Sequence, residues 1–464
     1  MSWGTSIARL ELVRAWRDPV MRAMLILFLI AAGYAALTGA RWAEQRQLAV
    51  QEAVAKADEI MGKRRDEFAA MVAKGEKPNF GLIYASALPF RAGLPNAPLA
   101  ALSAGQAEGY PAAANVAPFA DPWAMFDSHA TGLESPAVLA AGRFDLAFVI
   151  VVLMPLLLLA ATYDFWARDV ENGSARFQLA QPVRPAKLIL TRALVRGGSI
   201  LLGAMLIACG WLLAAGGQHM RDIAVLAMVI LAYGAFWIAL AILINLLVRV
   251  STTAALAGGT AWLAIVLLLP AVAVAVAELA APPPSAMAYT NAVRVAGLEV
   301  REANRSAARQ AATAESGRAY PASLWHSRGE ALQRDARLGP IHRAYAEGWA
   351  RHRALEDRLR FLSPAVIAQD ALDRVAGTDA GRATAFQRQA RDFAAEARKL
   401  AFDWMDKDRL MTLADYDRPL LRFEFVEPPR SGPLLRDILA LLLFTALVLA
   451  PAALRLRQGA AKLL

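Results

Sequence analysis

Long uncharged stretches alternate with charged ones along this chain, and the alternation predicts membrane-spanning helices. An apolar run of about 20 residues is long enough to cross the hydrocarbon core of a bilayer as a helix. We expect spans at 23–40, 146–163 and 437–454, and a third to a fifth span between 197 and 277. The pattern therefore predicts an all-α membrane protein with six transmembrane helices.

The first 22 residues follow a different pattern, because apolar and basic positions alternate at helical spacing. Trp3, Ile7 and Leu10 are interleaved with Arg9 and Arg14. Such a helix is suited to lying in the plane of the lipid headgroups. A signal peptide fits poorly, since no small-residue cleavage site closely follows the apolar run. We expect residues 1–22 to form an amphipathic interfacial helix.

Two long polar segments separate the spans, and the first covers residues 41–145. Its Ala-, Glu- and Lys-rich start, 42–74, predicts a helix that continues out of the first span. The Pro- and Gly-rich remainder disfavours long helices and predicts an irregular folded lobe. We expect its aromatic residues to pack as a small core, with a ligand surface as the alternative: Tyr84, Phe90, Tyr110, Phe119, Trp123 and Phe126.

The second polar segment, residues 278–436, is strongly helical in pattern. Ser363-Pro364 is a helix start, Gly377 a helix end, and Thr378-Asp379 a second cap. Four helices are expected, at 291–318, 327–360, 364–377 and 382–406. We expect a helical domain outside the membrane. Its dense Arg and Glu favour a solvated surface, with a basic groove for lipid phosphates or acidic peptides as the alternative.

The distribution of charge predicts how the chain crosses the membrane. Lys and Arg exceed the acids in 164–196, and the tail 455–464 is also basic. Basic loops stay on the cytoplasmic side. We therefore expect a multi-pass protein of the inner (plasma) membrane with both termini in the cytoplasm, residues 164–196 as a cytoplasmic loop, and both polar segments outside.

Composition narrows the function classes. The chain is 57% hydrophobic and carries a formal net charge of +10. Because much of the basic charge borders apolar spans, we expect it to meet lipid headgroups and not nucleic acid. The single cysteine excludes an intramolecular disulfide. Ionisable groups are nearly absent from the predicted spans, which disfavours transport driven by an ion gradient and favours an outside energy source.

The cytoplasmic loop contains a spaced motif, the run DVENGS followed by LAQPV and Lys187. It resembles the motif Glu-x-Glu-x-Gly-Thr-Leu, then Leu-Leu-x-x-Pro-Val and a basic residue, of ABC type-2 exporter permeases. Asp169, Ser174 and Ala175 depart from that pattern, which weakens any role for those side chains. The 363–386 region is similar to a subgroup of these permeases with insertions after the first and fifth spans.

The resemblance implies that residues 164–196 form a coupling loop that docks on a separate ATPase. The implied coupling residues are Asp169, Glu171, Gly173, Ser174, Arg176, Pro182 and Lys187. It also implies a second permease subunit, identical or paralogous, and an N-terminal elbow helix. The sequence has no Gly-x-x-x-x-Gly-Lys-Ser/Thr, so ATP and Mg²⁺ are expected on the partner ATPase, and this chain is expected to bind no cofactor and to catalyse no reaction.

Three alternatives remain at this point. The loop could be an ordinary basic loop with a capped helix. The chain could be an assembly or mechanical protein that uses the same motor to move its outer domain without transport. A membrane-anchored hydrolase is disfavoured because no nucleophile or metal motif is present. His326, His342 and His352 lie on a predicted charged helix, so we expect them to be solvated.

Overall fold

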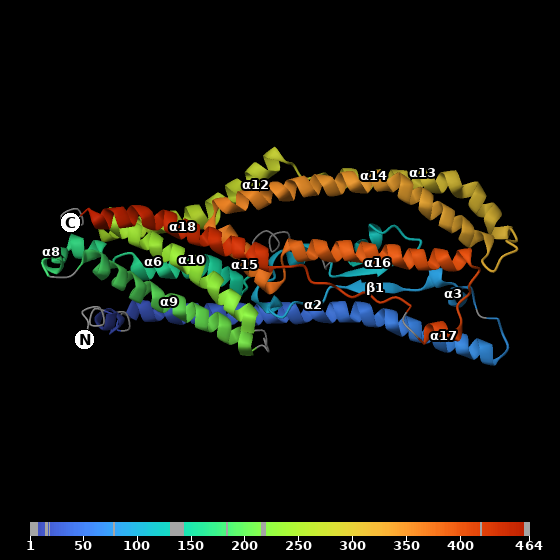
Figure 1. The fold of residues 1–464 in the computed structure, drawn as a ribbon, viewed down its shortest axis with the longest axis horizontal. Helices are drawn as coiled ribbons and strands as arrows, with labels where there is room; N and C mark the ends of the chain where they lie inside the picture. The colour runs from blue at the N-terminus through green and yellow to red at the C-terminus, as the bar shows by residue number, and fades with distance from the viewer. Residues whose placement is uncertain are drawn as a thin grey trace.

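The computed structural model describes residues 8–13, 17, 19–77, 79–129, 143–181, 184–214, 220–417 and 420–458. The molecule is elongated, with a bundle of apolar helices at one end and a mixed polar domain at the other (Figure 1). Helix α2, Pro19–Ala73, runs beside both halves. We call the two halves the bundle and the outer domain.

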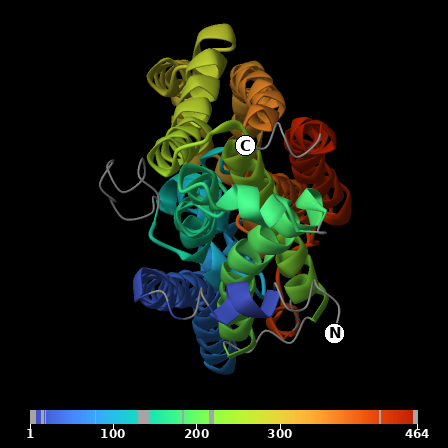
Figure 2. The same cartoon turned by 90° about the vertical axis from the view of Figure 1, so that its left-hand side faces the viewer.

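Six helices are long and apolar enough to cross a membrane, which confirms the predicted helical membrane protein. They lie within Met21–Ala73, Leu146–Glu171, Pro185–Trp211, Met220–Leu247, Ser251–Ala280 and Ser431–Arg457. Helix α10, Met220–Leu247, is the central one, since it packs on α9 (Pro185–Ala214), α6 (Met154–Thr162) and α18 (Ser431–Arg457). Viewed along the bundle, α2 and α18 lie on opposite sides of it (Figure 2).

Two of the spans contain a π-helical turn directly before a proline. The turn Val149–Leu153 joins α5 (Leu146–Phe148) to α6, which holds Pro155. The turn Leu263–Leu268 joins α11 (Ser251–Trp262) to α12 (Leu269–Ala280), which holds Pro270. A proline cannot donate the backbone hydrogen bond of a regular helix, and the wider turn accommodates it. Both prolines therefore shape the helices.

One expectation about the spans is wrong. Asp437, in the predicted span 437–454, is fully buried, whereas we expected no buried acidic or basic side chain there. Its oxygens accept hydrogen bonds from Arg360 and Arg374 of the outer domain. The carboxylate is tolerated because two arginines pair with it. The third span also differs, since α9 begins at Pro185, inside the predicted loop 164–196.

The outer domain contains the expected long helices. They are α13 (Ala286–Thr313), α14 (Ala322–Leu359), α15 (Pro364–Ala376) and α16 (Ala380–Asp406), followed by the short α17 (Leu413–Tyr416). The predicted caps are confirmed, because Ser363 and Asp379 accept backbone hydrogen bonds at the starts of α15 and α16. Gly377 ends α15 at a φ of +70°, which favours glycine.

In the described residues of the first polar segment, the larger hydrophobic cluster is shared with the second polar segment, whereas we expected a core of its own. After α3 (Phe80–Ile83) the first segment forms two antiparallel strands, β1 (Phe90–Gly93) and β2 (Ala113–Val116), with Phe90 opposite Val116. Phe90 packs edge-on against Phe393 of α16, at 6.1 Å between ring centroids. The two polar segments therefore share one core, which sequence patterns of either segment alone do not reveal.

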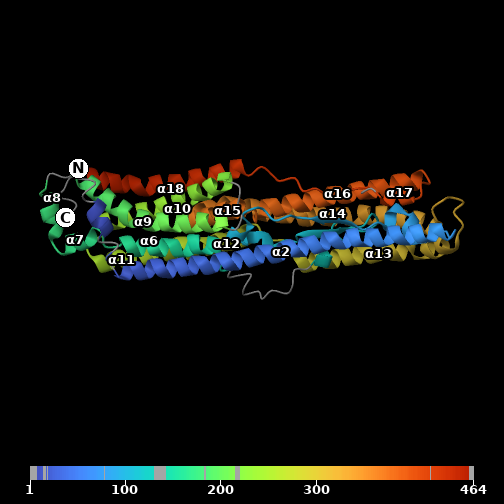
Figure 3. The same ribbon diagram turned by 90° about the horizontal axis from the view of Figure 1, so that it is seen from below.

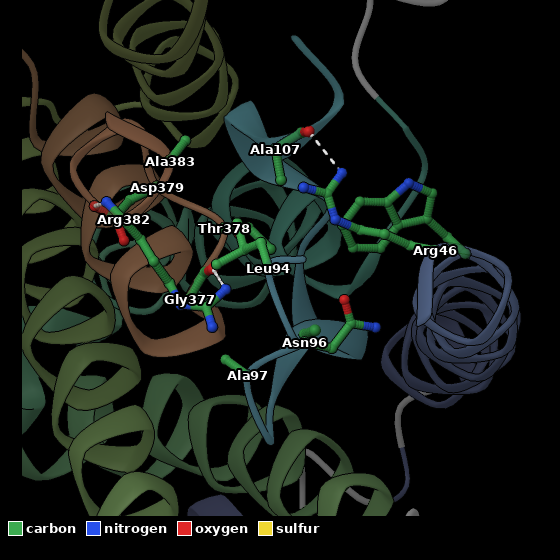
Figure 4. A pocket seen from close by; sticks show the side chains of 12 residues that line it. Arg46, Leu94, Asn96, Ala97, Ala107, Gly377, Thr378, Asp379, Arg382 and Ala383 are labelled. Atoms are coloured by element: carbon green, nitrogen blue, oxygen red, sulfur yellow. Dashed lines mark hydrogen bonds between the residues drawn. The ribbon is translucent and has the colours of Figure 1, made fainter. Parts of the chain in front are cut away.

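The junction of α2, this first segment and α16 is closed by two arginines (Figure 4). Arg46 of α2 donates to the carbonyl of Ala107. Arg382 of α16 donates to the carbonyls of Gly377 and Pro95 and pairs with Glu427. The arginines satisfy backbone carbonyls in irregular chain, where no neighbouring strand does so.

The histidines also differ from expectation, because two of them are buried. His342 of α14 lies between Tyr289 of α13 and Asp121, with its ring nitrogens 2.8 and 3.1 Å from their oxygens, and it stacks on Trp123. His352 contacts the carbonyl of Ala281. At His342 the α14 surface is therefore covered by α13 and by the first polar segment, and at His352 by the residue that follows α12.

Candidate coupling site at the α8 end of the bundle

Two short helices connect the second and third spans. Helix α7 covers Ala167–Glu171 and α8 covers Ser174–Leu179. They lie at the end of the bundle farthest from the outer domain, next to residues 8–13 and the last turns of α18 (Figures 1 and 3). Among the predicted coupling residues, Gly173 lies between α7 and α8, and the others except Pro182 fall in α7, α8 or the first turn of α9. Pro182 lies outside the described residues.

Gly173 makes the corner between α7 and α8. Its φ of +73° lies in the left-handed region, and a Cβ there would meet no neighbouring atom within 4 Å. The restriction therefore comes from the backbone and not from crowding. A β-branched residue is disfavoured at this φ, so the sequence Asn-Gly-Ser is well suited to this sharp corner.

Asp169 connects α7 to both following helices. Its Oδ1 accepts from the Ser174 hydroxyl at 2.9 Å, and its Oδ2 accepts from the Gln178 amide at 2.9 Å. The same Oδ2 accepts from the Arg192 guanidinium of α9 at 2.5 Å. The departures from the family pattern at positions 169 and 174 thus form a matched pair. Both side chains therefore have a structural role in this chain, and their role in coupling stays a prediction.

A buried charge network continues from Asp169 along α9. Arg192 Nε lies 3.1 Å from Glu11, which belongs to the helical residues 8–13. Arg196 pairs with Glu11 at 3.2 Å and with Asp164 at 2.9 Å. Three carboxylates therefore share two guanidiniums, and the pairing is strengthened by the low exposure of the groups. We call Glu11, Asp164, Asp169, Arg192 and Arg196 the coupling-end cluster.

Asn245 of α10 fixes the point where the second span ends. Its Oδ1 accepts from the backbone amides of Trp166 and Ala167, and its Nδ2 donates to the carbonyls of Thr162 and Ala241. These backbone groups lie where α6 ends and α7 begins, and a buried amide side chain satisfies them. The contacts give Asn245 a role in joining α10 to the end of the second span.

Glu171 contacts the start of the fifth span. Its Oε2 accepts from the Ser251 backbone amide at 3.0 Å and from the Ser251 hydroxyl at 2.7 Å. A carboxylate at the first residue of a helix satisfies a free amide and faces the positive end of the helix dipole. Glu171 thus links α7 to α11.

The surface of α8 turned away from the network is exposed. Phe177 is 79% exposed, and Arg176 is exposed beside it. Lys187 is exposed in the first turn of α9. Aromatic residues are enriched in protein–protein interfaces, so Phe177 is available as a contact residue of α8. Sequence reasoning missed Phe177, although an apolar residue between Arg176 and Gln178 is a visible signal.

Sequence reasoning did not connect Asp169 to its partner Arg192, nor Arg192 to Glu11, which lies far away in the sequence. An acid between Leu10 and Leu12 in an otherwise basic segment is the only signal of Glu11. The residues that the structure describes contain no group of three His, Cys, Asp or Glu side chains placed to hold a metal ion.

Comparison with known proteins gives one match. Residues 300–425 match DUF3526, a domain of unknown function. No curated protein and no solved structure matches the chain. The matched segment runs from α13 to the chain after α17 and lies in the outer domain, away from α7 and α8.

Proposed function

We propose that this chain is the transmembrane permease subunit of an ATP-driven exporter of the ABC type-2 class, and that α7 and α8 dock on a separate ATPase. The observation that supports this most is the two-sided character of α8. Asp169 connects one side of it to α9, while Phe177 is exposed on the other. A docking element needs both a free contact surface and a stiff connection to what it moves.

The stiff connection reaches several spans. Asp169 binds α9, Asn245 binds α10 to the start of α7, and Glu171 binds the start of α11. A displacement of α8 therefore acts on three helices through short hydrogen bonds. Motion of packed helices as rigid bodies is the usual way in which such a displacement spreads.

The proposed complex contains two permease subunits, identical or paralogous, and two ATPases. ATP and Mg²⁺ bind the ATPases, and this chain supplies no catalytic group. Two docking loops related by a two-fold axis match the two nucleotide-binding subunits. The complex lies in the inner membrane with residues 8–13 and α8 on the cytoplasmic side, as the basic residues of 164–196 favour. Residues 1–22 act as the elbow helix, and the outer domain is extracytoplasmic.

A second candidate is mechanical work on a partner outside the membrane. It is favoured by α2, a single helix of 55 residues that continues from the bundle into the outer domain. In addition, α15 of the outer domain packs on α10 and α18. Motion of the bundle can therefore reach the outer domain without any substrate crossing the bilayer.

The test uses the full complex purified with its ATPase and reconstituted in vesicles. Phe177→Ala is expected to lower ATPase binding by about tenfold or more, since a contact aromatic contributes about 2 kcal/mol. Leu48→Ala, which truncates an exposed apolar residue on α2 far from α8, is the matched control. Unchanged ATPase binding and unchanged nucleotide-dependent activity in Phe177→Ala would reject α8 as the docking element.

Two readouts then separate the candidates. ATPase activity stimulated by a vesicle-enclosed substrate, with movement of that substrate, supports export. Activity stimulated only by a soluble extracytoplasmic protein, with no solute movement, supports the mechanical role.

A further inference from the structure

A cavity of about 700 Å³ lies where the bundle meets the outer domain. One wall comes from α12 and the first turns of α18, both within candidate spans. The other comes from the last turns of α14, from α15 and from the start of α16. A cavity of this size is typical of small-ligand sites. Its position places it at one interface of the bilayer.

The lining has two chemical characters. Apolar residues lie on the bundle side and along α14 and α15, including Pro270, Ala273, Val274, Leu359 and Val366. Arginines of α14, α15 and the start of α18 line the same cavity, at positions 353, 360, 374, 430 and 436. A ligand that satisfies both needs an anionic head and an apolar tail.

The ion pairs within the cavity wall leave part of this positive charge uncompensated. Arg360 pairs with Asp370 and Asp437, and Arg374 pairs with Asp437. In the part of the chain that the structure describes, Arg353, Arg430 and Arg436 have no carboxylate within 4.0 Å. Arg436 instead lies over the ring of Phe361, at 5.4 Å from its centroid.

Each of the four carboxylates that line the cavity has a polar partner, and Glu356 and Asp357 also remain exposed. Asp370 pairs with Arg360, and Asp357 lies 3.9 Å from the same guanidinium. Glu356 lies 3.3 Å from His352. Asp379 caps α16 by accepting from the Arg382 amide. The groups left to meet a ligand are therefore mainly guanidiniums, which bind phosphate oxygens through paired N–H groups.

We propose that this cavity binds the anionic, phosphate-bearing headgroup of a membrane lipid, with the first part of an acyl chain along α12. Arg353, Arg430 and Arg436 contact the phosphate, and Ala273 and Val274 contact the chain. The site is a property of this chain alone, and it does not depend on whether α8 docks on an ATPase.

The test is a titration of the full chain in neutral detergent micelles with dioleoylphosphatidylglycerol, followed by native mass spectrometry. Wild type is expected to bind the lipid more tightly than dioleoylphosphatidylcholine, whose choline cation would face the arginines. The triple variant Arg353→Gln/Arg430→Gln/Arg436→Gln is expected to lose at least about tenfold in affinity for the anionic lipid. If the triple variant does not fold, the single variant Arg436→Gln replaces it, because it breaks no ion pair. It is expected to lose part of the affinity for the anionic lipid.

Arg343→Gln is the matched control, because Arg343 is an exposed arginine of the same α14 outside the cavity. It is expected to bind as wild type does. An equal loss in Arg343→Gln would show a general effect of surface charge and would overturn the site. Equal affinity for both lipids, or no loss in the arginine variants, would overturn it too. Displacement of the lipid by inorganic phosphate alone would overturn the lipid assignment in favour of free phosphate.

Discussion

The two ends of the bundle both carry buried ion pairs, but they are built differently. The coupling-end cluster has three carboxylates for two arginines, and Asp169 and Arg196 keep some access to solvent. The second set has two carboxylates for two arginines. We call it the outer-end cluster, and its members are Arg360, Asp370, Arg374 and Asp437. Its central residue, Asp437, is 0% exposed. The outer-end cluster joins two domains around a fully buried carboxylate, whereas every carboxylate of the coupling-end cluster keeps some access to solvent.

The difference matters for motion. Breaking a fully buried pair leaves an uncompensated charge in a medium of low polarity, so such a joint moves as one body. Pairs with access to water exchange partners at lower cost. We therefore infer that the outer domain follows the bundle as one body, and that the pairs that connect α7 and α8 to α9 can be broken at lower cost.

The largest expected effect follows from removal of Asp437. Asp437→Ala leaves Arg360 and Arg374 without their shared carboxylate, and we expect the free energy of unfolding to fall by about 3–5 kcal/mol. The measurement is unfolding of the detergent-solubilised chain followed by circular dichroism. Asp406→Ala, which breaks an exposed pair with Arg328, is the control and should cost at most about 1 kcal/mol. Equal losses in both variants would contradict the contrast between closed and exposed pairs.

Breaking the coupling-end cluster should have a smaller effect on stability. Asp169→Asn keeps the size of the side chain but removes the charge that faces Arg192, so we expect a loss of about 1–3 kcal/mol. ATPase stimulation by the reconstituted complex should fall as well, because α8 loses its connection to α9. Arg168→Gln changes an exposed arginine of the same helix and should leave both quantities nearly unchanged. A full loss of folding in Asp169→Asn would show that this end is as closed as the other.

The outer end should also respond to pH. Burial, together with the neighbouring Asp370 and Asp145, raises the pKa of Asp373 to about 8, although Ser103 donates a hydrogen bond to it. The folded chain then holds this proton more tightly than the unfolded chain, so stability falls as pH rises from about 4 to about 8. The slope is at most about 1.4 kcal/mol per pH unit.

Thermal unfolding across that pH range measures the slope, and Asp373→Asn should flatten it. Asp392→Asn, at an α16 position outside this group, is the control. A slope that survives unchanged in Asp373→Asn would assign the pH dependence to other groups.

The smallest effect on stability is expected at Gly173. A valine at its φ of +73° costs about 1–2 kcal/mol locally, which α8 can relieve by shifting into open space. Gly173→Val should therefore insert and fold but uncouple ATPase activity from transport. Gly198→Val, on α9 with no atom near its added Cβ, is a matched control that keeps an ordinary backbone conformation. Normal coupling in Gly173→Val would favour the alternative interpretation, in which residues 164–196 form an ordinary basic loop.

Local sequence signals predicted much of this fold. Uncharged runs located the six apolar helices, and the caps at Ser363, Gly377 and Asp379 located α15 and α16. These signals are reliable because each depends on residues within one or two helical turns. Gly173 is another such local signal, because the sharp turn between α7 and α8 requires its left-handed backbone conformation.

The remaining features depend on partners far apart in the sequence. Asp437 lies in a predicted span, and its partners Arg360 and Arg374 lie far from it in the sequence. Strand β1 packs on α16, about 300 residues later. The link between Glu11 and Arg196 spans 185 positions. Neither periodicity nor composition carries information about such pairs. The sequence therefore predicted the helices but not the long-range contacts between them.

The most direct test of the account places a photo-crosslinking phenylalanine analogue at position 177 in intact cells and identifies the adducts by mass spectrometry. Phe177 is the exposed residue of α8, whereas Gln178 beside it donates to Asp169 and serves as the inward control. The account predicts a crosslink from 177, and a much weaker one from 178, to a polypeptide that carries a P-loop. Crosslinks from 177 only to lipid, or to a protein on the side of the outer domain, would contradict it.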